Sequence, residues 1–261
     1  MLNAWQRAMI FPGAATRGTP EAQVTPPEEA RLVALETVAG QSVTALLGEG
    51  TGDGDEPVTV LYFYGNGMCL NDSLLEFRDF RRMGARVLIP DYVGYGMSTG
   101  EPSERGCYET ADACWEFLRT REGGRPGKLV LGGWSLGAAV ALDLAARHPG
   151  EVAGLMLFSA FTSLADVAQR IYPFLPVRLL LQYHFDNLAK IAAVTCPILI
   201  GHGELDSLNP PAMSDRLAMA AGGPVTRVVA EGAEHNEFFA AGGSDVRVGI
   251  CTFLQKLESV A

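Results

Sequence analysis

The sequence predicts an α/β fold, with a mostly parallel central sheet of about eight strands and helices on both faces. From residue 58 onward, short runs rich in Val, Ile and Leu alternate with longer helical segments, which is typical of strands buried on both faces. The chain has 261 residues, of which 48% are hydrophobic and 19% are charged. This composition suits a globular protein, and the length allows a single domain over residues 1–261.

The chain before residue 58 follows a different pattern. Residues 31–38 and 42–47 are strand-like runs joined by Ala39-Gly40-Gln41, and they predict an antiparallel hairpin. The stretch 12–30 is rich in Pro, Gly, Thr and Glu and predicts irregular surface chain. Residues 1–11 form a short amphipathic start.

The regular part of the chain alternates strands with helices. Strands are expected at 58–64, 86–90, 128–131, 152–158, 197–201 and 225–230. Helices are expected at 70–83, 103–121, 136–147, 211–221 and from 237 to about 259. The alternation breaks at 159–193, where two prolines stand among aromatic and aliphatic residues without strand spacing. We expect a short, irregular cap insertion there, within the single domain.

One five-residue stretch, Gly133-Trp134-Ser135-Leu136-Gly137, lies on the turn between an expected strand and an expected helix. Its G-x-S-x-G pattern is that of a nucleophile elbow, in which a sharp turn exposes the serine hydroxyl. Glycines suit such a turn because it leaves little room for Cβ atoms. The pattern also arises by chance in a chain with 30 glycines, so a catalytic Ser135 needs partners elsewhere in the sequence.

A serine hydroxyl is a poor nucleophile at neutral pH and needs a base, which is itself oriented by an acid. The predicted base is His235, because loops that follow parallel strands build the sites of such sheets. We expect His148 to cap the C-terminus of the helix at 136–147, and His202 to be structural. His184 lies in the cap and is either a surface residue or part of a pocket.

The predicted acid is Asp206, which follows the penultimate strand in Gly203-Glu204-Leu205-Asp206. The chain order Ser135, Asp206, His235 is that of α/β-hydrolases and differs from two common protease orders. Glu204 is the alternative acid, although a surface or supporting role is the main expectation for it.

The oxyanion of an acyl-transfer intermediate needs hydrogen-bond donors. One expected donor is the N–H of Leu136, the residue after the serine. The other is expected from the loop Tyr64-Gly65-Asn66-Gly67, where Asn66 or Gly67 supplies a backbone N–H.

Together these residues resemble the α/β-hydrolase superfamily, and in particular its branch of depalmitoylating thioesterases and related membrane-associated serine hydrolases. The resemblance covers nearly the whole chain and implies the α/β-hydrolase fold. Besides the elbow, the stretches that carry it are Tyr64-Gly65-Asn66-Gly67, Asp91-Tyr92-x-Gly94-Tyr95-Gly96-x-Ser98-x-Gly100-x-Pro102-Ser103-Glu104, the cap segment from Ala160 to Ile191, His202-Gly203-Glu204-x-Asp206, and Glu234-His235-Asn236.

The sequence departs from this family in two respects. The family's histidine at the oxyanion loop is Tyr64 here, which keeps the backbone donors and changes a supporting hydrogen bond. We expect no upstream transmembrane or Cys-rich segment of the kind that some eukaryotic relatives carry, so their membrane substrates need not apply here. The stretch from Asp91 to Glu104 is expected to be scaffold rather than catalytic.

The cap is expected to cover Ser135 and to supply an apolar pocket for an acyl chain. Some of its aromatic residues must instead pack the cap onto the sheet. The residues assigned to substrate binding are Phe161, Tyr172, Phe174 and Tyr183.

The net charge bears on the partners of the protein, and the cysteine content bears on its disulfides, metal sites and cellular compartment. The net charge of −10 argues against nucleic acid or an anionic membrane as the main partner. Five cysteines without a C-x-x-C pair predict neither a disulfide framework nor a zinc site, and they favour a reducing compartment. We expect Cys69, beside the oxyanion loop, to be a buried structural thiol.

The N-terminus lacks a signal peptide, and no stretch reaches the roughly 18 apolar residues of a transmembrane helix. A cytoplasmic protein without stable membrane insertion is expected. Residues 1–11 either pack on the domain or contact a membrane at its periphery.

The expected activity is hydrolysis of a small-molecule or acyl ester or thioester, without a metal or cofactor. Two alternatives stay open: a peptidase or amidase with the same triad, and a non-catalytic binding protein with this fold. In the cap, Asp166 and Asp186 offer little acidic charge to recognise an amine, which ranks the amidase below the esterase.

Overall fold

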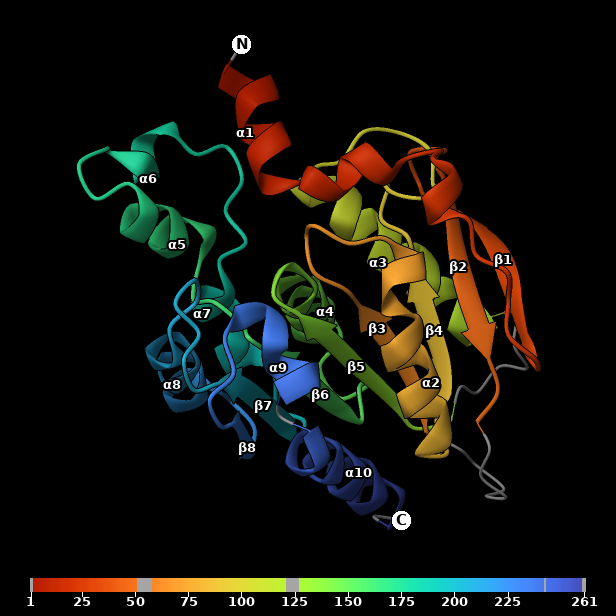
Figure 1. Ribbon diagram of the computed structural model, residues 1–261. Helices are drawn as coiled ribbons and strands as arrows, with labels where there is room; N and C mark the ends of the chain where they lie inside the picture. The colour runs from red at the N-terminus through yellow and green to blue at the C-terminus, as the bar shows by residue number, and fades with distance from the viewer. Residues whose placement is uncertain (1, 51–57, 121–126, 242, 260–261) are drawn as a thin grey trace. The chain divides into compact units, whose positions relative to one another are not determined.

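The computed structural model describes residues 2–50, 58–120, 127–241 and 243–259 (Figure 1). The chain divides into two compact units, residues 1–130 and residues 131–261. The boundary falls within strand β5 (Leu129–Trp134). The single domain expected from the sequence stays a prediction.

The first unit contains the antiparallel hairpin that the sequence predicts. Its strands are β1 (Ala30–Glu36) and β2 (Ser42–Gly48). β2 also pairs antiparallel with β4 (Arg86–Pro90), and β4 pairs parallel with β3 (Thr59–Phe63). β3 and β4 are buried along their whole length, as expected for strands covered on both faces.

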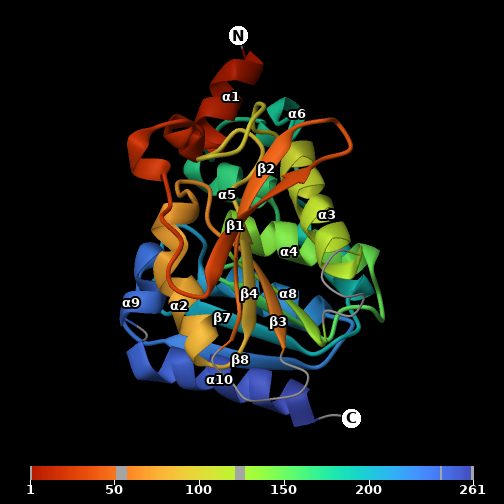
Figure 2. The same ribbon diagram turned by 90° about the vertical axis from the view of Figure 1, so that its right-hand side faces the viewer.

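Two longer helices of this unit lie on opposite sides of β4 (Figure 2). α2 (Leu74–Arg82) follows a single 3-10 turn, Leu70–Ser73. α3 (Glu104–Thr120) begins where the Ser103 hydroxyl accepts a hydrogen bond from the N–H of Gly106 at 2.9 Å, which is an N-cap contact. The expected end of this helix at residue 121 lies outside the described residues.

The chain ahead of β1 is more regular than expected. α1 (Leu2–Ile10) is followed by two 3-10 turns, Pro12–Thr16 and Pro20–Ala22. Each turn has proline at its start, where the missing N–H costs nothing and the fixed φ favours helical backbone. Within the part of the chain that the structure describes, no helix has the length and apolar character needed to cross a bilayer.

The second unit carries the remaining parallel strands. They are β6 (Gly154–Phe158), β7 (Ile198–Gly203) and β8 (Val225–Ala230), with β7 paired parallel to both neighbours. The strand order of the sheet is β1-β2-β4-β3-β5-β6-β7-β8. The mostly parallel eight-stranded sheet that the sequence predicts is confirmed.

α4 (Leu136–Arg147) has the bounds expected from the sequence and packs on β6. Its residues from Leu136 to Ala145 are all buried, which explains why it is rich in Ala and Leu on every side. The helix ends at His148, whose backbone N–H donates to the carbonyl of Ala145, and a proline follows.

The last helices cover the end of the sheet. α8 (Pro211–Ala220) contacts β7, and α10 (Gly243–Ser259) contacts β7 and β8. The single final helix expected from 237 to 259 is instead a 3-10 turn, His235–Glu237, followed by α9 (Phe238–Ala241) and α10.

The cap at 159–193 is helical, so the expectation of irregular chain is wrong. It contains α5 (Leu164–Ile171), α6 (Val177–Leu180) and α7 (Asn187–Lys190). Two of these helices have four residues, too few to show a helical period in the sequence. Ser163 nevertheless caps α5 by accepting a hydrogen bond from the N–H of Asp166 at 3.1 Å.

The cap leaves and re-enters the fold through one narrow point, here called the neck. At the neck, the Asn187 side-chain amide donates to the carbonyl of Phe161 at 2.8 Å, and the Leu188 N–H donates to the carbonyl of Thr162 at 2.9 Å. Lys190 then forms an ion pair with Asp143 of α4. Figure 1 shows α5 and α6 beyond the neck, away from β6, β7 and β8.

Truncating the core of α4 should destabilise the second unit. Leu142 is 0% exposed, whereas Met219 on α8 is 88% exposed. We expect Leu142→Ala to lower the free energy of unfolding by about 2–5 kcal/mol, because it leaves a cavity. The matched control Met219→Ala should change it by less than about 0.5 kcal/mol. Urea denaturation followed by circular dichroism measures both, and equal losses would contradict the assigned core.

Candidate active site

The turn between β5 and α4 holds Ser135 in a strained backbone conformation. Its φ is 55° and its ψ is −112°, a region that residues other than glycine rarely adopt. Its N–H donates to the carbonyl of Phe158 in β6 at 2.8 Å. An added Cβ at Gly133 would collide with the backbone of Gly137 and Ala138, so the turn requires glycine there. The predicted elbow is present at the N-terminus of α4.

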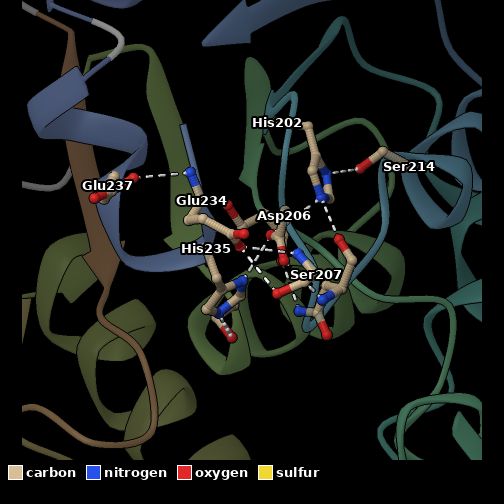
Figure 3. A network of polar contacts seen from close by, with 10 residues as sticks. His202, Asp206, Ser207, Ser214, Glu234, His235 and Glu237 are labelled. Atoms are coloured by element: carbon tan, nitrogen blue, oxygen red, sulfur yellow. Dashed lines mark hydrogen bonds and ion pairs between the residues drawn. The ribbon is translucent and has the colours of Figure 1, made fainter. Parts of the chain in front are cut away.

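The predicted acid and base lie within hydrogen-bonding distance of the serine and of each other. His235 Nε2 lies 3.1 Å from Ser135 Oγ. His235 Nδ1 lies 2.7 Å from Asp206 Oδ2 (Figure 3). All three side chains are buried. Because an ionised carboxylate only accepts, Nδ1 carries the hydrogen and Nε2 of a neutral ring faces the serine hydroxyl as an acceptor. This arrangement can activate a hydroxyl for nucleophilic attack.

The loop after β7 holds the carboxylate of Asp206 in place. Oδ1 accepts a hydrogen bond from the N–H of Asn209 at 2.8 Å. The Asn209 side-chain amide donates to the carbonyl of Ser159, at the end of β6, at 2.9 Å. Asp206 is therefore linked through Asn209 to the end of β6, the same strand whose Phe158 carbonyl accepts from the Ser135 N–H.

His202 contacts the acid, which the sequence reading did not anticipate. Its Nε2 lies 2.6 Å from the carbonyl oxygen of Asn209 and 3.3 Å from Asp206 Oδ2. Its Nδ1 lies 2.6 Å from the hydroxyl of Ser214 on α8 (Figure 3). The side chain is 2% exposed.

The pKa of Asp206 reflects two opposing effects. Burial raises the pKa of this carboxyl, but hydrogen bonds from His202 and His235, the charge of His235 and the Asn209 N–H together lower it to about 2. Asp206 is therefore ionised throughout the pH range in which His235 acts as a base.

The loop that carries His235 is hydrogen-bonded to the loop that carries Asp206. The Glu234 carboxylate accepts from the N–H and the hydroxyl of Ser207, at 3.1 and 3.0 Å. The Glu234 N–H donates to Glu237, which closes the turn that starts with His235 (Figure 3). Glu204, the alternative acid, accepts from the N–H of Gly232 at 3.0 Å and supports the same loop.

Trp134 packs against the base. Its ring centroid lies 5.2 Å from that of His235, with an interplanar angle of 32°. Among the described residues, its indole Nε1 is buried and has no hydrogen-bond partner. The contact restricts the orientation of the imidazole.

The expected oxyanion donors lie in different units. Leu136 is the first residue of α4, so its N–H has no acceptor within the helix. Asn66 and Gly67 belong to the first unit. There the Asn66 side chain donates to the carbonyl of Ile10 at 2.9 Å, and the Asn66 carbonyl accepts from the Tyr95 hydroxyl at 2.9 Å. These bonds fix the loop to the N-terminal segment.

Tyr64 replaces the family histidine with a buried hydroxyl. Tyr64 donates to Asp91 Oδ1 at 2.8 Å, and Asp91 also accepts from the N–H groups of Leu70 and Met97. Burial raises the pKa of Asp91, and these donors oppose that rise. Asp91 thus organises the loops around β3 and β4, which agrees with the scaffold role expected for it.

The four cap residues assigned to substrate binding occupy different environments. Phe161 is 4% exposed at the neck, and Phe174 is 97% exposed between α5 and α6. Tyr172 and Tyr183 are partly exposed. Their role in binding stays a prediction.

The remaining expectations concern residues away from the triad. His148 ends α4 as expected, and His184 is exposed. All five cysteines are free. Cys69 is buried, and burial together with its bond to Asp72 raises the pKa of its thiol to about 11, which makes it unreactive.

Sequence reasoning missed the network around the acid, namely His202, Asn209 and Ser214. One signal was available: His202 precedes Asp206 by four residues at a strand's carboxyl end, where polar side chains gather around a site. Asn209 and Ser214 carry no such signal, because their roles depend on how the acid loop folds back.

Comparisons with known proteins concern the family and the fold. A sequence profile described as the alpha/beta hydrolase fold matches residues 58–179. An uncharacterised protein of Mycobacterium tuberculosis is 43% identical over 155 residues, which are 59% of this chain and 54% of that protein. Alpha/beta hydrolase domain-containing protein 17B of Xenopus laevis is 35% identical over 184 residues, 69% of this chain and 60% of that protein. The chain thus spans little more than half the length of these relatives.

Among solved structures, an esterase of Pyrococcus furiosus is similar with a TM-score of 0.71 and 16% sequence identity. The match covers 89% of this chain and 99% of the esterase. At this identity the likeness concerns the fold.

Stability should depend on the ionisation of Asp206. A folded-state pKa of about 2 lies below the unfolded value of about 3.9, so the ionised carboxylate stabilises the fold above about pH 4, and this contribution is lost as the pH falls towards 2. We expect the stability difference between wild type and Asp206→Asn to shrink over this range. Guanidinium denaturation at stepped pH measures it, and a constant difference would contradict the assigned hydrogen bonds.

Proposed function

Because the chain belongs to the α/β-hydrolase superfamily, we propose that it is a serine hydrolase that cleaves carboxylic ester or thioester bonds. The observation that carries the proposal is the continuous contact from Ser135 Oγ through His235 to Asp206, at 3.1 and 2.7 Å. The strained backbone of Ser135 further supports the proposal. Backbone strain gathers at functional sites, and a nucleophilic serine needs a base beside it.

In the first step, Ser135 Oγ attacks the carbonyl carbon while His235 Nε2 takes the hydroxyl proton. Asp206 stabilises the imidazolium that forms through the bond at Nδ1. The tetrahedral intermediate collapses to an acyl-enzyme as His235 returns the proton to the leaving alcohol or thiol. Water, deprotonated by His235, then attacks the acyl-enzyme carbonyl, and the acyl–Oγ bond breaks as His235 returns the proton to Ser135 Oγ, which releases the acid.

We propose that the Leu136 N–H and a backbone N–H of Asn66 or Gly67 bind the oxyanion. Support comes from the start of α4, where the helix dipole favours negative charge. The Asn66 side chain is already bonded to Ile10, which leaves its backbone as the donor to consider.

We propose that the cap binds the acyl chain. Exposed apolar side chains gather on α5, α6 and their connection, and such surfaces mark binding sites in many proteins. They are Ile171, Phe174, Leu175, Leu179 and Leu180.

We propose a reducing, cytoplasmic location. The five cysteines are free, and Cys107 and Cys114 are fully buried thiols without a disulfide partner.

A fluorophosphonate probe tests the nucleophile directly. Wild type should be labelled, and Ser135→Ala should lose both labelling and p-nitrophenyl acetate hydrolysis, with a loss of at least about 10³-fold in rate. The control Ser244→Ala changes an exposed serine on α10 and should react as wild type does. Equal labelling of Ser135→Ala would refute the proposal. Faster turnover of aminoacyl amides than of esters would assign the triad to an amidase instead.

A series of p-nitrophenyl esters from two to sixteen acyl carbons tests the cap. Phe174→Ala should raise KM for the long esters by about tenfold, because a buried aromatic contact contributes on the order of 1.4 kcal/mol or more. It should leave the acetate unchanged and the fold intact, since Phe174 is almost fully exposed. Met219→Ala, an exposed apolar residue on α8, is the matched control. An unchanged chain-length profile would exclude Phe174 from the acyl site.

A further inference from the structure

The buried histidine beside the acid is fixed at both ring nitrogens. Nε2 of His202 lies 2.6 Å from the Asn209 carbonyl and 3.3 Å from Asp206 Oδ2, and Nδ1 lies 2.6 Å from the Ser214 hydroxyl. His202 is at the carboxyl end of β7, and Ser214 lies in the second turn of α8. Figure 3 shows the ring between the acid and the helix.

These contacts determine which nitrogen carries the hydrogen. A carbonyl and an ionised carboxylate have no proton to donate, so Nε2 must be the donor to both in a three-centre hydrogen bond. In the neutral ring, Nδ1 is then an acceptor, and the hydroxyl of Ser214 is the donor that it faces. Ser214 is fully buried, so no bulk water competes for this bond.

The carboxylate therefore receives hydrogen bonds from three directions. Oδ1 accepts from the Asn209 N–H, while Oδ2 accepts from His235 on one side and from His202 on the other. Three donors on two oxygens fix the rotation of the carboxylate about its Cβ–Cγ bond, and with it the direction from which His235 is held.

The other nearby carboxylates are engaged elsewhere. Glu204 accepts from the Gly232 N–H, and Glu234 accepts from Ser207. The groups that face Asp206 are thus His202 from β7, the Asn209 N–H from its own loop and His235 from the loop after β8.

We propose that His202, held as the Nε2–H tautomer by the Asn209 carbonyl and the Asp206 carboxylate, is a positioning residue that orients the Asp206 carboxylate towards His235. This inference rests on the proposed serine-hydrolase function. His202 touches neither Ser135 nor a substrate in this arrangement, and it acts through the acid. Ser214 acts one step further out, by holding the ring at Nδ1.

The tautomer can be read directly, because the chain has four histidines. Long-range ¹H–¹⁵N spectra of ¹⁵N-histidine-labelled wild type, assigned with the single variants His148→Gln, His184→Gln and His202→Gln, should show His202 with its hydrogen on Nε2. Ser214→Ala should alter this pattern and shift the signals of His235. A hydrogen on Nδ1 of His202 in wild type would overturn the proposal, whatever the activity.

Kinetics test the effect on the triad. His202→Leu removes the donor, and we expect kcat to fall by about ten- to a hundredfold with KM within about twofold, less than the roughly 10⁴-fold that loss of an acid costs. His202→Gln keeps a side-chain N–H donor and should recover most of this loss. The control His148→Gln, a partly exposed histidine at the end of α4, should behave as wild type does.

The pH profile separates positioning from packing. Without the His202 donor, burial of Asp206 is less opposed, so the pKa of Asp206 rises and the acid-induced loss of stability, followed by guanidinium denaturation at stepped pH, shifts to higher pH in His202→Leu. An unchanged pH dependence of stability together with an unchanged kcat in folded His202→Leu would overturn the proposal, and so would an equal loss in His202→Gln. If His202→Leu does not fold, the spectra of wild type and of Ser214→Ala test the proposal in its place. A wild type that fails to react with fluorophosphonate contradicts the proposed function, while the tautomer result stands separately.

Discussion

The strained turn at Ser135 is the constraint on which the rest of the second unit depends. A left-handed serine between β5 and α4 requires a glycine at position 133 and a hydrogen bond to the Phe158 carbonyl. That bond aligns the end of β6 with the elbow, and Ser159 at the end of β6 in turn receives the amide of Asn209 from the acid loop. Ser135 and Asp206 are thus positioned from the same strand end. The strained backbone of Ser135 persists because several surrounding contacts constrain it at once.

Much of this architecture could be predicted because it follows from periodicity and order along the chain. β4, α4 and β8 occur at the bounds expected, since a buried strand, an Ala- and Leu-rich helix and a β-branched edge strand each leave a continuous signature in the sequence. The contact among Ser135, Asp206 and His235 could be expected because each follows a parallel strand, and the carboxyl ends of such strands meet at one edge of a sheet.

The parts that could not be predicted depend on contacts between segments distant in the sequence. The position of His202 before Asp206 also suits a core histidine, so its contact with the acid does not follow from the sequence. Its partners Asn209 and Ser214 are ordinary loop and helix residues until the loop folds back on β7. The cap helices are hard to predict for another reason: α6 and α7 have only four residues each, too few for a measurable period, and Pro173 and Pro176 interrupt the chain between α5 and α6.

The neck has a consequence for how such a protein can diversify. Because Phe161 and Thr162 accept hydrogen bonds from Asn187 and Leu188, the two ends of the intervening segment lie side by side. Lengthening this segment costs little loop-closure entropy, since the cost grows only with the logarithm of the segment's length. Replacement segments of different size and polarity can therefore be grafted at the neck while the loops that bear Asp206 and His235 keep their own hydrogen bonds.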